Sequence, residues 1–277
     1  MPELPEVEIV TSSLNKLING RTIRFAELLR DKLAHRETRS TFAEKLENMT
    51  VNDVRRRGKH ILFELNNDLT LITHLRMSGR FQLFSFEREN PKFTHAVFYL
   101  ENDERLIFSD QRHFGFMQIV RTSNINEVKE LRNLAPEPFS EEFSVEYLRA
   151  TLNSSARRVK EFILDQTKVC GLGNIYAAEA LFLSRINPLK PANEVSAIKA
   201  RRLHGFIREV MAESIEQGST LNIDPENLER NYYGGGYEDH WRVYDREGEP
   251  CIACATNIKR LKHGGRSSYF CPKCQRM

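Results

Sequence analysis

The sequence has no apolar run close to the roughly 18 residues that a membrane-spanning helix needs. Its acidic start also lacks the basic segment that opens a secretory signal peptide. These absences argue against an integral membrane protein and against a secreted one that carries such a signal. We therefore expect an intracellular, cytoplasmic protein with no membrane partner.

A strong excess of either charge is also missing, because 41 Lys and Arg residues face 38 Asp and Glu residues. Overall charge therefore does not predict a nucleic-acid partner. The distribution is more informative, since the segment Cys251–Met277 contains six basic residues and no acidic one. A short basic module at the end of a nearly neutral chain favours a polyanionic partner.

Cysteine is scarce, with five residues in 277, and four of the five form two close pairs. This argues against a disulfide framework and fits a reducing compartment. Two Cys-x2-Cys pairs separated by 16 residues match the spacing of a tetrahedral zinc site, with disulfides or an iron cluster as the alternatives. We predict one structural Zn²⁺ ion and a buried, apolar role for Cys170. The predicted ligands are Cys251, Cys254, Cys271 and Cys274.

Residues 1–135 have the pattern of one helix followed by antiparallel strands. Apolar residues recur at helical spacing from Val7 to Ile18, and short alternating segments joined by turn residues follow. We expect a two-layered sandwich or a flattened barrel. The predicted strands are Arg21–Leu29, Thr50–Arg57, His60–Leu65, Leu69–Ile72, Ala96–Leu100 and Arg105–Phe108.

The pattern changes near Pro136, after which helical periodicity dominates. We predict an α+β multidomain protein with a β-sandwich domain at 1–135, a helical domain at 141–217, a connecting loop at 218–250 and a zinc module at 251–277. The predicted helices of the second domain are Val145–Leu152, Val159–Gln166, Ile175–Leu183 and Ala197–Gln217.

The first eight residues, Met1-Pro2-Glu3-Leu4-Pro5-Glu6-Val7-Glu8, allow two interpretations. One is an ordinary helix start, with proline and acids in the first turn. The other is chemical: without Met1, Pro2 presents a secondary amine with a pKa near 8 in model compounds, and this amine can attack an electrophilic carbon. Glu3 would then move protons at the reacting sugar.

Several motifs in order resemble the formamidopyrimidine-DNA glycosylase family, whose members are bifunctional base-excision enzymes with an N-terminal proline nucleophile. Leu4 resembles the formamidopyrimidine branch, since the endonuclease VIII branch usually has Gly there. The resemblance rests on the first eight residues, Arg57-Gly58-Lys59, His74–Gly79, Asp110–Gly115, Gly171–Ala177 and the four-cysteine unit.

The resemblance implies a role for each matching position. Pro2 would form the Schiff base, Glu3 would transfer protons, and Glu6 would support them. From residue type alone, His74 would be an ordinary structural histidine, and the wedge residues named below would be core hydrophobes and a surface arginine. The family instead implies phosphate contacts at Lys59, His74, Asn174 and Arg266, and Lys59 and Arg266 would also act in elimination. It implies void-filling wedges at Met77, Arg112 and Phe114. Lys160 would make a contact near the extruded nucleotide.

The resemblance also implies an overall activity and its partners. It predicts a monomeric glycosylase and AP lyase that excises oxidised purines, namely 8-oxoguanine and formamidopyrimidines, from double-stranded damaged DNA and nicks the strand by β,δ-elimination. In a bacterium such a protein would be nucleoid-associated.

Two alternatives are an endonuclease VIII-like enzyme for oxidised pyrimidines and a non-catalytic, zinc-dependent binder of distorted DNA. Three features depart from the family pattern: Phe93 and Ala255 stand where His and Gly are frequent, and segment 218–238 differs in the loop that closes over the extruded base.

Overall fold

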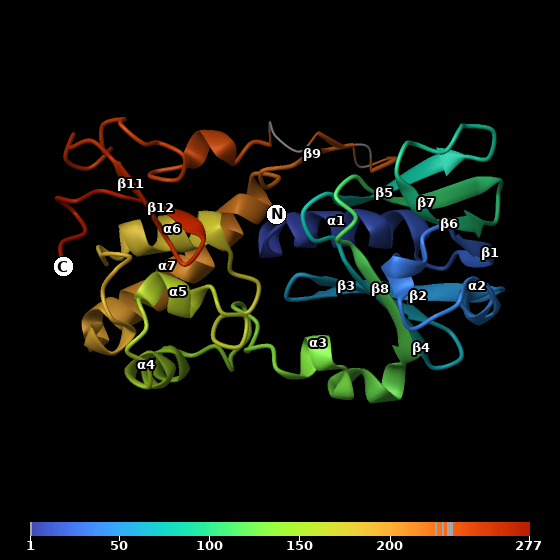
Figure 1. The fold of residues 1–277 in the computed structure, drawn as a ribbon, viewed down its shortest axis with the longest axis horizontal. Coiled ribbons are helices and arrows are strands. Elements are labelled where there is room, and N and C mark those ends of the chain that lie inside the picture. The colour runs from blue at the N-terminus through green and yellow to red at the C-terminus, as the bar shows by residue number, and fades with distance from the viewer. Residues whose placement is uncertain (1, 225, 229, 232–234) are drawn as a thin grey trace. The chain divides into compact units, whose positions relative to one another are not determined.

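The computed structural model describes residues 2–224, 226–228, 230–231 and 235–277. It divides into two compact units, Met1–Arg132 with Leu221–Gly234, and Asn133–Thr220 with Gly235–Met277 (Figure 1). Each unit is described by itself. Among the described residues, none of the helices combines the length and the apolar character that crossing a membrane requires.

The first unit begins with helix α1 (Leu4–Ile18), which has Glu3 at its N-cap and a proline in its first turn. The backbone N–H of Glu3 donates to Oε2 of Glu6 at 2.8 Å, which is one half of a capping box. The apolar face of α1 is buried because its residues recur every three or four positions: Val7, Val10, Leu14 and Ile18.

Eight antiparallel strands follow α1, in the spatial order β5-β7-β6-β1-β2-β3-β4-β8. Strands β1 and β2 pair at only two positions, so the sheet divides into two four-stranded halves that face each other as a sandwich. Hairpins β3–β4 and β6–β7 turn on Asn-Asp pairs with positive φ, the geometry that fits the twist of such hairpins. The strands are β1 (Thr22–Leu28), β2 (Met49–Arg57), β3 (His60–Leu65), β4 (Leu69–His74), β5 (Gly79–Ser85), β6 (Thr94–Leu100), β7 (Glu104–Asp110) and β8 (Phe116–Arg121).

One apolar core lies between the two halves and α1. It includes the helix residue Val10 and the aromatic residues Phe63, Phe81, Phe98 and Phe108. Short helices surround the sandwich: η1 (Asp31–Ala34), α2 (Arg39–Leu46), η2 (Thr122–Glu127) and α3 (Lys129–Arg132).

A later segment of the chain returns to the first unit. Leu221 and Leu228 are buried in its core, and the N–H of Leu83 in β5 donates to the carbonyl of Asn227 at 2.8 Å. Two short strands, β9 (Asn222–Ile223) and β10 (Arg230–Asn231), pair within this segment. The sequence suggested only a loop for 218–250, because strands of two residues leave no periodicity. Pro225, Glu229 and residues 232–234 of this atypical stretch lie outside the described residues.

The second unit contains helices α4 (Val145–Asn153), α5 (Val159–Ile163), α6 (Asn174–Leu183) and α7 (Ala197–Glu216), with 3-10 turns η3 (Ala192–Glu194) and η4 (Glu238–His240). Ser144 and Ser196 cap α4 and α7 by accepting backbone N–H bonds. Helix α5 ends three residues before the predicted Gln166, because Asp165 accepts bonds from the backbone and hydroxyl of Thr167 and forms a turn.

A β-hairpin, β11 (Lys259–His263) and β12 (Arg266–Phe270), ends the second unit and packs near α6 (Figure 1). The completely buried carboxylate of Glu179 in α6 accepts the backbone N–H groups of Arg242, Val243 and Tyr244. Burial raises the pKa of Glu179, and these three bonds and the nearby Arg242 oppose that rise. The chain leading into the hairpin is thereby fixed to α6. The predicted α+β class, with a sandwich, a helical domain and a terminal hairpin, is confirmed.

Candidate active site and nucleic-acid contacts

Pro2 and Glu3 lie at the head of α1, and both are buried. Glu3 is only 3% exposed and Glu6 2%, so two carboxyl groups share the positive end of a helix. The Glu6 side chain fixes the Glu3 backbone through the capping bond described above. The predicted catalytic pair therefore occupies a buried position on a regular element of the first unit.

The turn between β2 and β3 carries Lys59, which is also largely buried. Gly58 has φ +59°, a conformation that glycine adopts without strain. Arg56 ties this turn to α1, since its Nε lies 2.6 Å from Oε2 of Glu8 and its Nη1 donates to the Gly58 carbonyl. The turn with Lys59 is thus held beside the helix that begins with Pro2 and Glu3.

His74 ends β4 and pairs in register with His60 of β3, with ring centroids 4.7 Å apart. The backbone N–H of Arg76 donates to Nδ1 of His74 at 2.9 Å, so the neutral ring carries its proton on Nε2. Burial is the main cause that lowers the pKa of both rings, for His60 to about 4, and the charge of Lys59 lowers that of His74 further. His74 is therefore an uncharged N–H donor, a suitable partner for a phosphate oxygen.

The three predicted wedge residues come together on two neighbouring loops of the first unit. Met77 lies between β4 and β5, while Arg112 and Phe114 lie between β7 and β8. Met77 is 39% exposed and Phe114 57%, and the Arg112 guanidinium carbon lies 5.4 Å from the centre of the Phe114 ring. Two exposed apolar side chains and a guanidinium form a group of the kind that can enter a base stack.

A buried carboxylate that the sequence did not single out connects these two loops. Asp110 Oδ1 accepts from the Ser78 hydroxyl and from the Arg112 N–H, and Oδ2 accepts from the Gly115 N–H at 2.6 Å. Ser78 Oγ also accepts the Arg112 N–H at 2.9 Å. An Asp at the end of a strand before a turn is the signal that could have indicated this role.

Two glycines allow the wedge loops to lie close to the core. A Cβ at Gly79 or at Gly115 would lie 2.8 Å from a ring carbon of Phe108, and at Gly79 also 2.5 Å from the Leu75 carbonyl oxygen. Real Cβ atoms almost never approach another atom so closely. The two loops therefore rest on one buried aromatic ring.

In the second unit, Asn174 is the first residue of α6, after a loop containing two glycines. Gln166 shapes this loop by accepting the Gly171 N–H and donating to the Leu172 carbonyl. Among the described residues, Oδ1 of Asn174 has no hydrogen-bond partner. A helix start of this kind suits a phosphate contact.

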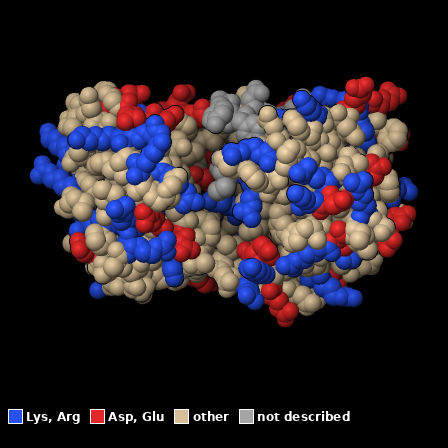
Figure 2. Space-filling view, viewed as in Figure 1, with Lys and Arg blue, Asp and Glu red and all other residues tan. Residues whose placement is uncertain are grey.

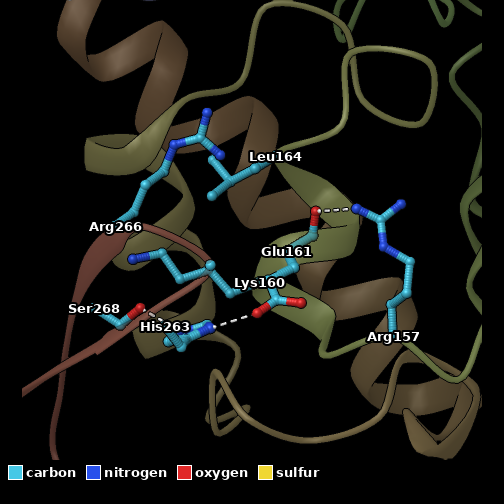
Figure 3. Close-up of a pocket in the computed structure, with 8 residues that line it drawn as sticks. Arg157, Lys160, Glu161, Leu164, His263, Arg266 and Ser268 are labelled. Atoms are coloured by element: carbon cyan, nitrogen blue, oxygen red, sulfur yellow. Dashed lines mark hydrogen bonds and ion pairs between the residues drawn. The ribbon is translucent and has the colours of Figure 1, made fainter.

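A pocket of about 190 Å³ lies between α5 and the hairpin (Figure 3). It is basic, since Arg157, Lys160 and Arg266 line it with the single carboxylate Glu161. Arg266 follows the Gly264-Gly265 turn, whose φ angles are both positive.

Two side chains of α5 hold the hairpin at this pocket. Lys160 is 1% exposed, and its Nζ donates to the Ser267 carbonyl at 2.8 Å. His263 bridges Oε1 of Glu161 at 3.0 Å and Oγ of Ser268 at 2.7 Å, as Figure 3 shows. The sequence indicated neither Glu161 nor His263.

The four predicted cysteine ligands come together at the base of the hairpin, with all Sγ atoms within 4.8 Å of one another. Two of the Sγ pairs, Cys251–Cys274 and Cys254–Cys271, are 3.9 and 3.5 Å apart, close to the roughly 3.8 Å edge of a tetrahedral Zn–S₄ site. Hydrogen bonds from Thr256 lower the pKa of Cys254 to about 6, whereas burial raises that of Cys274 to about 12. A bound dication would favour the thiolate at every position.

Charge is distributed unevenly over the surface. Figure 2 shows a group of Lys and Arg side chains at the end of the second unit where the hairpin lies, with Asp and Glu side chains elsewhere on that unit, and both signs are intermixed over the sandwich. The structure thus gathers Pro2, Glu3, Lys59, His74 and the wedge residues in the first unit, and Lys160, Asn174, Arg266 and the cysteines in the second.

Three family models match successive parts of the chain. They are the formamidopyrimidine-DNA glycosylase N-terminal domain at residues 1–117, the formamidopyrimidine-DNA glycosylase H2TH domain at 134–224, and the zinc finger found in FPG and IleRS at 248–276. An N-terminal helix with a β-sandwich, this helical domain and the four-cysteine hairpin define the class: a zinc-finger DNA repair glycosylase.

Similar proteins agree over the whole length. The formamidopyrimidine-DNA glycosylases of Lactiplantibacillus plantarum and Rickettsia conorii are both 39% identical to this chain; the alignment covers 100% of both chains for the first and 99% of both for the second. The Lactococcus lactis Fpg in complex with abasic-site DNA is 32% identical, with a TM-score of 0.92 and coverage of 99% of this chain and 100% of that one. The chain belongs to the formamidopyrimidine-DNA glycosylase family.

Proposed function

We propose that this protein is a bifunctional DNA glycosylase and AP lyase that removes oxidised purines, 8-oxoguanine and formamidopyrimidines, from duplex DNA. The observation that carries the proposal is the buried Pro2-Glu3 pair at the head of α1, in a chain of this family. A protein that only binds DNA has no use for a free Pro2 amine beside Glu3.

The proposed chemistry begins at the Pro2 nitrogen once Met1 has been removed. This secondary amine attacks C1′ of the damaged nucleotide, the C1′–N bond to the base breaks, and the base leaves with that electron pair and takes a proton. Opening of the sugar ring, with Glu3 supplying a proton to O4′, gives an iminium cation that has no N–H proton to lose. The cation therefore remains an electron sink next to C2′.

Strand cleavage follows from this electron sink. Loss of a proton from C2′ lets the C3′–O bond break, and a second elimination breaks the C5′–O bond, which leaves a one-nucleotide gap. Lys59 serves as a proton donor and a phosphate contact in these steps, and Arg266, whose guanidinium keeps its protons, contacts the phosphate during the later elimination. Both eliminations move only protons and electron pairs, and water attacks only to release the sugar fragment from Pro2.

We assign DNA binding to two kinds of residue, those that contact phosphates and those that act as wedges. Lys59 and Arg266 offer charge, while His74 and Asn174 offer neutral polar contacts, so we expect an affinity that falls steeply with salt. Met77, Arg112 and Phe114 fill the space of the everted nucleotide, and Lys160 acts beside it through the hairpin that it holds. One chain supplies every residue of the scheme, so a monomer suffices.

One Zn²⁺ ion is proposed to be held by Cys251, Cys254, Cys271 and Cys274. Four thiolates complete a tetrahedral shell and leave no position for substrate, so the metal supplies rigidity to the hairpin rather than chemistry. The hairpin in turn presents Arg266 to DNA.

Borohydride trapping on abasic-site DNA tests the proposal. Protein whose N-terminus is shown by mass spectrometry to be Pro2 is expected to form a covalent adduct that survives denaturation. The matched control retains one residue before Pro2, which makes its nitrogen an amide, and it should bind the same duplex without forming the adduct. Cleavage of the duplex by processed protein with no trapped species would overturn the scheme.

Lesion preference is tested separately, with a panel of duplexes that each carry one lesion. The Lactococcus lactis Fpg has been solved with both kinds of lesion: a mutant in complex with Fapy-dG DNA, and the wild type in complex with DNA containing an oxidised pyrimidine. We expect faster excision of 8-oxoguanine than of thymine glycol. The reverse order would favour the endonuclease VIII-like alternative, and binding without excision or trapping would favour the non-catalytic binder.

A further inference from the structure

The loop between β7 and β8 has a histidine contact between its two wedge residues. His113 lies between Arg112 and Phe114 and has φ +61°, a left-handed conformation that histidine adopts more readily than most residues. Its Nδ1 lies 2.9 Å from Nε2 of His95, and the two rings are nearly parallel at 11°. His95 belongs to β6 and is only 3% exposed.

This contact supplies a third attachment for the loop. Asp110 holds the backbone at Arg112 and at Gly115, which are the two ends of the exposed segment. The side chain of His113, which is exposed like those of its neighbours, holds the middle of the loop through its contact with the buried His95 of β6. A loop of five residues attached at both ends and at its centre has few conformations left, and so its outward side chains are oriented before DNA binds.

We propose that His95 and His113 are positioning residues that set Arg112 and Phe114 for contact with the base opposite the lesion, and that protonation of the pair releases this setting. The inference rests on the proposed function, in which those two residues enter the base stack.

The chemistry of two bonded imidazoles makes the pair sensitive to pH. With one or no extra proton, a single N–H···N bond joins the rings. A second extra proton puts N–H groups on both facing nitrogens, so the bond is lost and two cations repel each other. The doubly protonated pair cannot keep its contact at 2.9 Å.

The surroundings of His95 determine when this happens. Burial, His113 and Arg30 all lower the pKa of His95, and Asp110 on β7 opposes them. Phe93 packs edge-on against His113, and Lys92 lies 5.1 Å from the centre of the Phe93 ring. Burial outweighs the effect of Asp110, so the His95 ring takes its proton at a lower pH than an ordinary histidine does.

The test uses the full chain and four duplexes, each with a single abasic site opposite one of the four normal bases. Single-turnover strand cleavage and affinity are measured from pH 5 to pH 8. For His113→Ala we expect about tenfold weaker binding and a similar loss of discrimination among the four opposite bases, with the cleavage rate at saturation largely retained. His113→Asn keeps a polar group near the Nδ1 position and tolerates positive φ, so it should restore discrimination at pH 8.

The pH profile separates positioning from a merely structural role. Wild-type discrimination should fall toward the acid end of the range, whereas His113→Asn and His95→Gln, which do not titrate there, should have flat profiles. Equal profiles in wild type and both variants would overturn the inference. Loss of melting temperature without any change in discrimination would also overturn it.

Phe114→Ala distinguishes a failure of the inference from a failure of the proposed function. If Phe114→Ala weakens binding and discrimination while His113→Ala does not, the positioning role is wrong and the wedge stands. If Phe114→Ala changes neither, the wedge assignment itself is wrong.

Discussion

The first unit of this protein and the terminal hairpin of the second are stabilised by different means. The first encloses an apolar core between α1 and both halves of its sandwich, and its functional side chains lie on that core or on loops resting on it. The hairpin of the second unit has few buried apolar residues, among them Tyr269 and Phe270, beside four cysteines. The proposed covalent reagent, Pro2, thus lies on a rigid body, whereas Arg266 of the hairpin depends on contacts from α5 and on the proposed metal.

Among the tests of this contrast, removal of the metal should have the largest effect. Structural zinc sites contribute on the order of 10 kcal/mol to the folding of a small module, so a strong chelator or Cys271→Ala should unfold the hairpin. DNA affinity should fall by at least a hundredfold, because Arg266 loses its position. Fluorescence anisotropy with a labelled abasic-site duplex measures this loss.

The first unit is the internal control for metal removal. Amide hydrogen exchange should rise throughout β11 and β12 and stay unchanged in β3 and β7 of the sandwich. If chelation also opened the sandwich, the two units would not be independent and the comparison would fail.

Acid, unlike removal of the metal, should destabilise the sandwich. The pKa of His60 is lowered from 6.5 to about 4, so the folded unit binds its proton later than the unfolded chain does. The resulting stability is complete above pH 6.5 and is lost as the pH falls toward 4, by about 3 kcal/mol. His74 acts in the same direction.

Urea unfolding of wild type and of His60→Phe measures this acid dependence, since phenylalanine keeps an aromatic ring without its titration. The difference in unfolding free energy between the two proteins should shrink or reverse as the pH drops from 7 to 4. A constant difference over that range would show that His60 is not responsible.

The next largest effect should come from removing the hydrogen bond between Lys160 of α5 and the hairpin. Lys160→Met keeps the length of the side chain but leaves the Ser267 carbonyl without its buried donor, which costs about 1–3 kcal/mol. We expect weaker DNA binding and faster exchange in β12, with the melting midpoint of the sandwich unchanged. The matched variant Glu161→Gln retains a hydrogen bond to His263 and should have less than half of that effect; an equal loss in both would indicate general disruption of α5.

Sequence patterns predicted the helices and strands well where the patterns were local. Helices α1, α4, α6 and α7 and the hairpins β3–β4 and β6–β7 were expected, because amphipathic spacing and Asn-Asp turns are visible in the chain. Strands β5 and β8 and helix α2 were not expected from the sequence. Strand β5 is buried on both faces and so does not alternate, and α2 buries only Phe42 and Leu46.

The site was predictable only in part, for a related reason. The four cysteines are defined by spacing alone, and their clustering is confirmed. The roles of Pro2, Glu3 and the wedge residues came from family resemblance and stay predictions. The supporting residues His95 and Glu161 act through contacts between distant segments, and no local pattern reports those contacts.

A departure from the family pattern provides the smallest test, again within the four-cysteine module. Ala255 has φ +58°, a conformation that costs an L-residue about 1 kcal/mol relative to glycine. Ala255→Gly should therefore stabilise the module by up to about that amount and slow zinc loss to a chelator severalfold. Gly248→Ala is the converse control. Gly248 has φ +84°, and no atom lies within 4 Å of an added Cβ, so the substitution changes only backbone strain. Zinc loss should therefore accelerate. Neither change should move the unfolding of the sandwich. If Gly248→Ala accelerated zinc loss and Ala255→Gly had no effect, the left-handed residue after Cys254 would not be limiting, and the stability of the module would rest on its four thiolates alone.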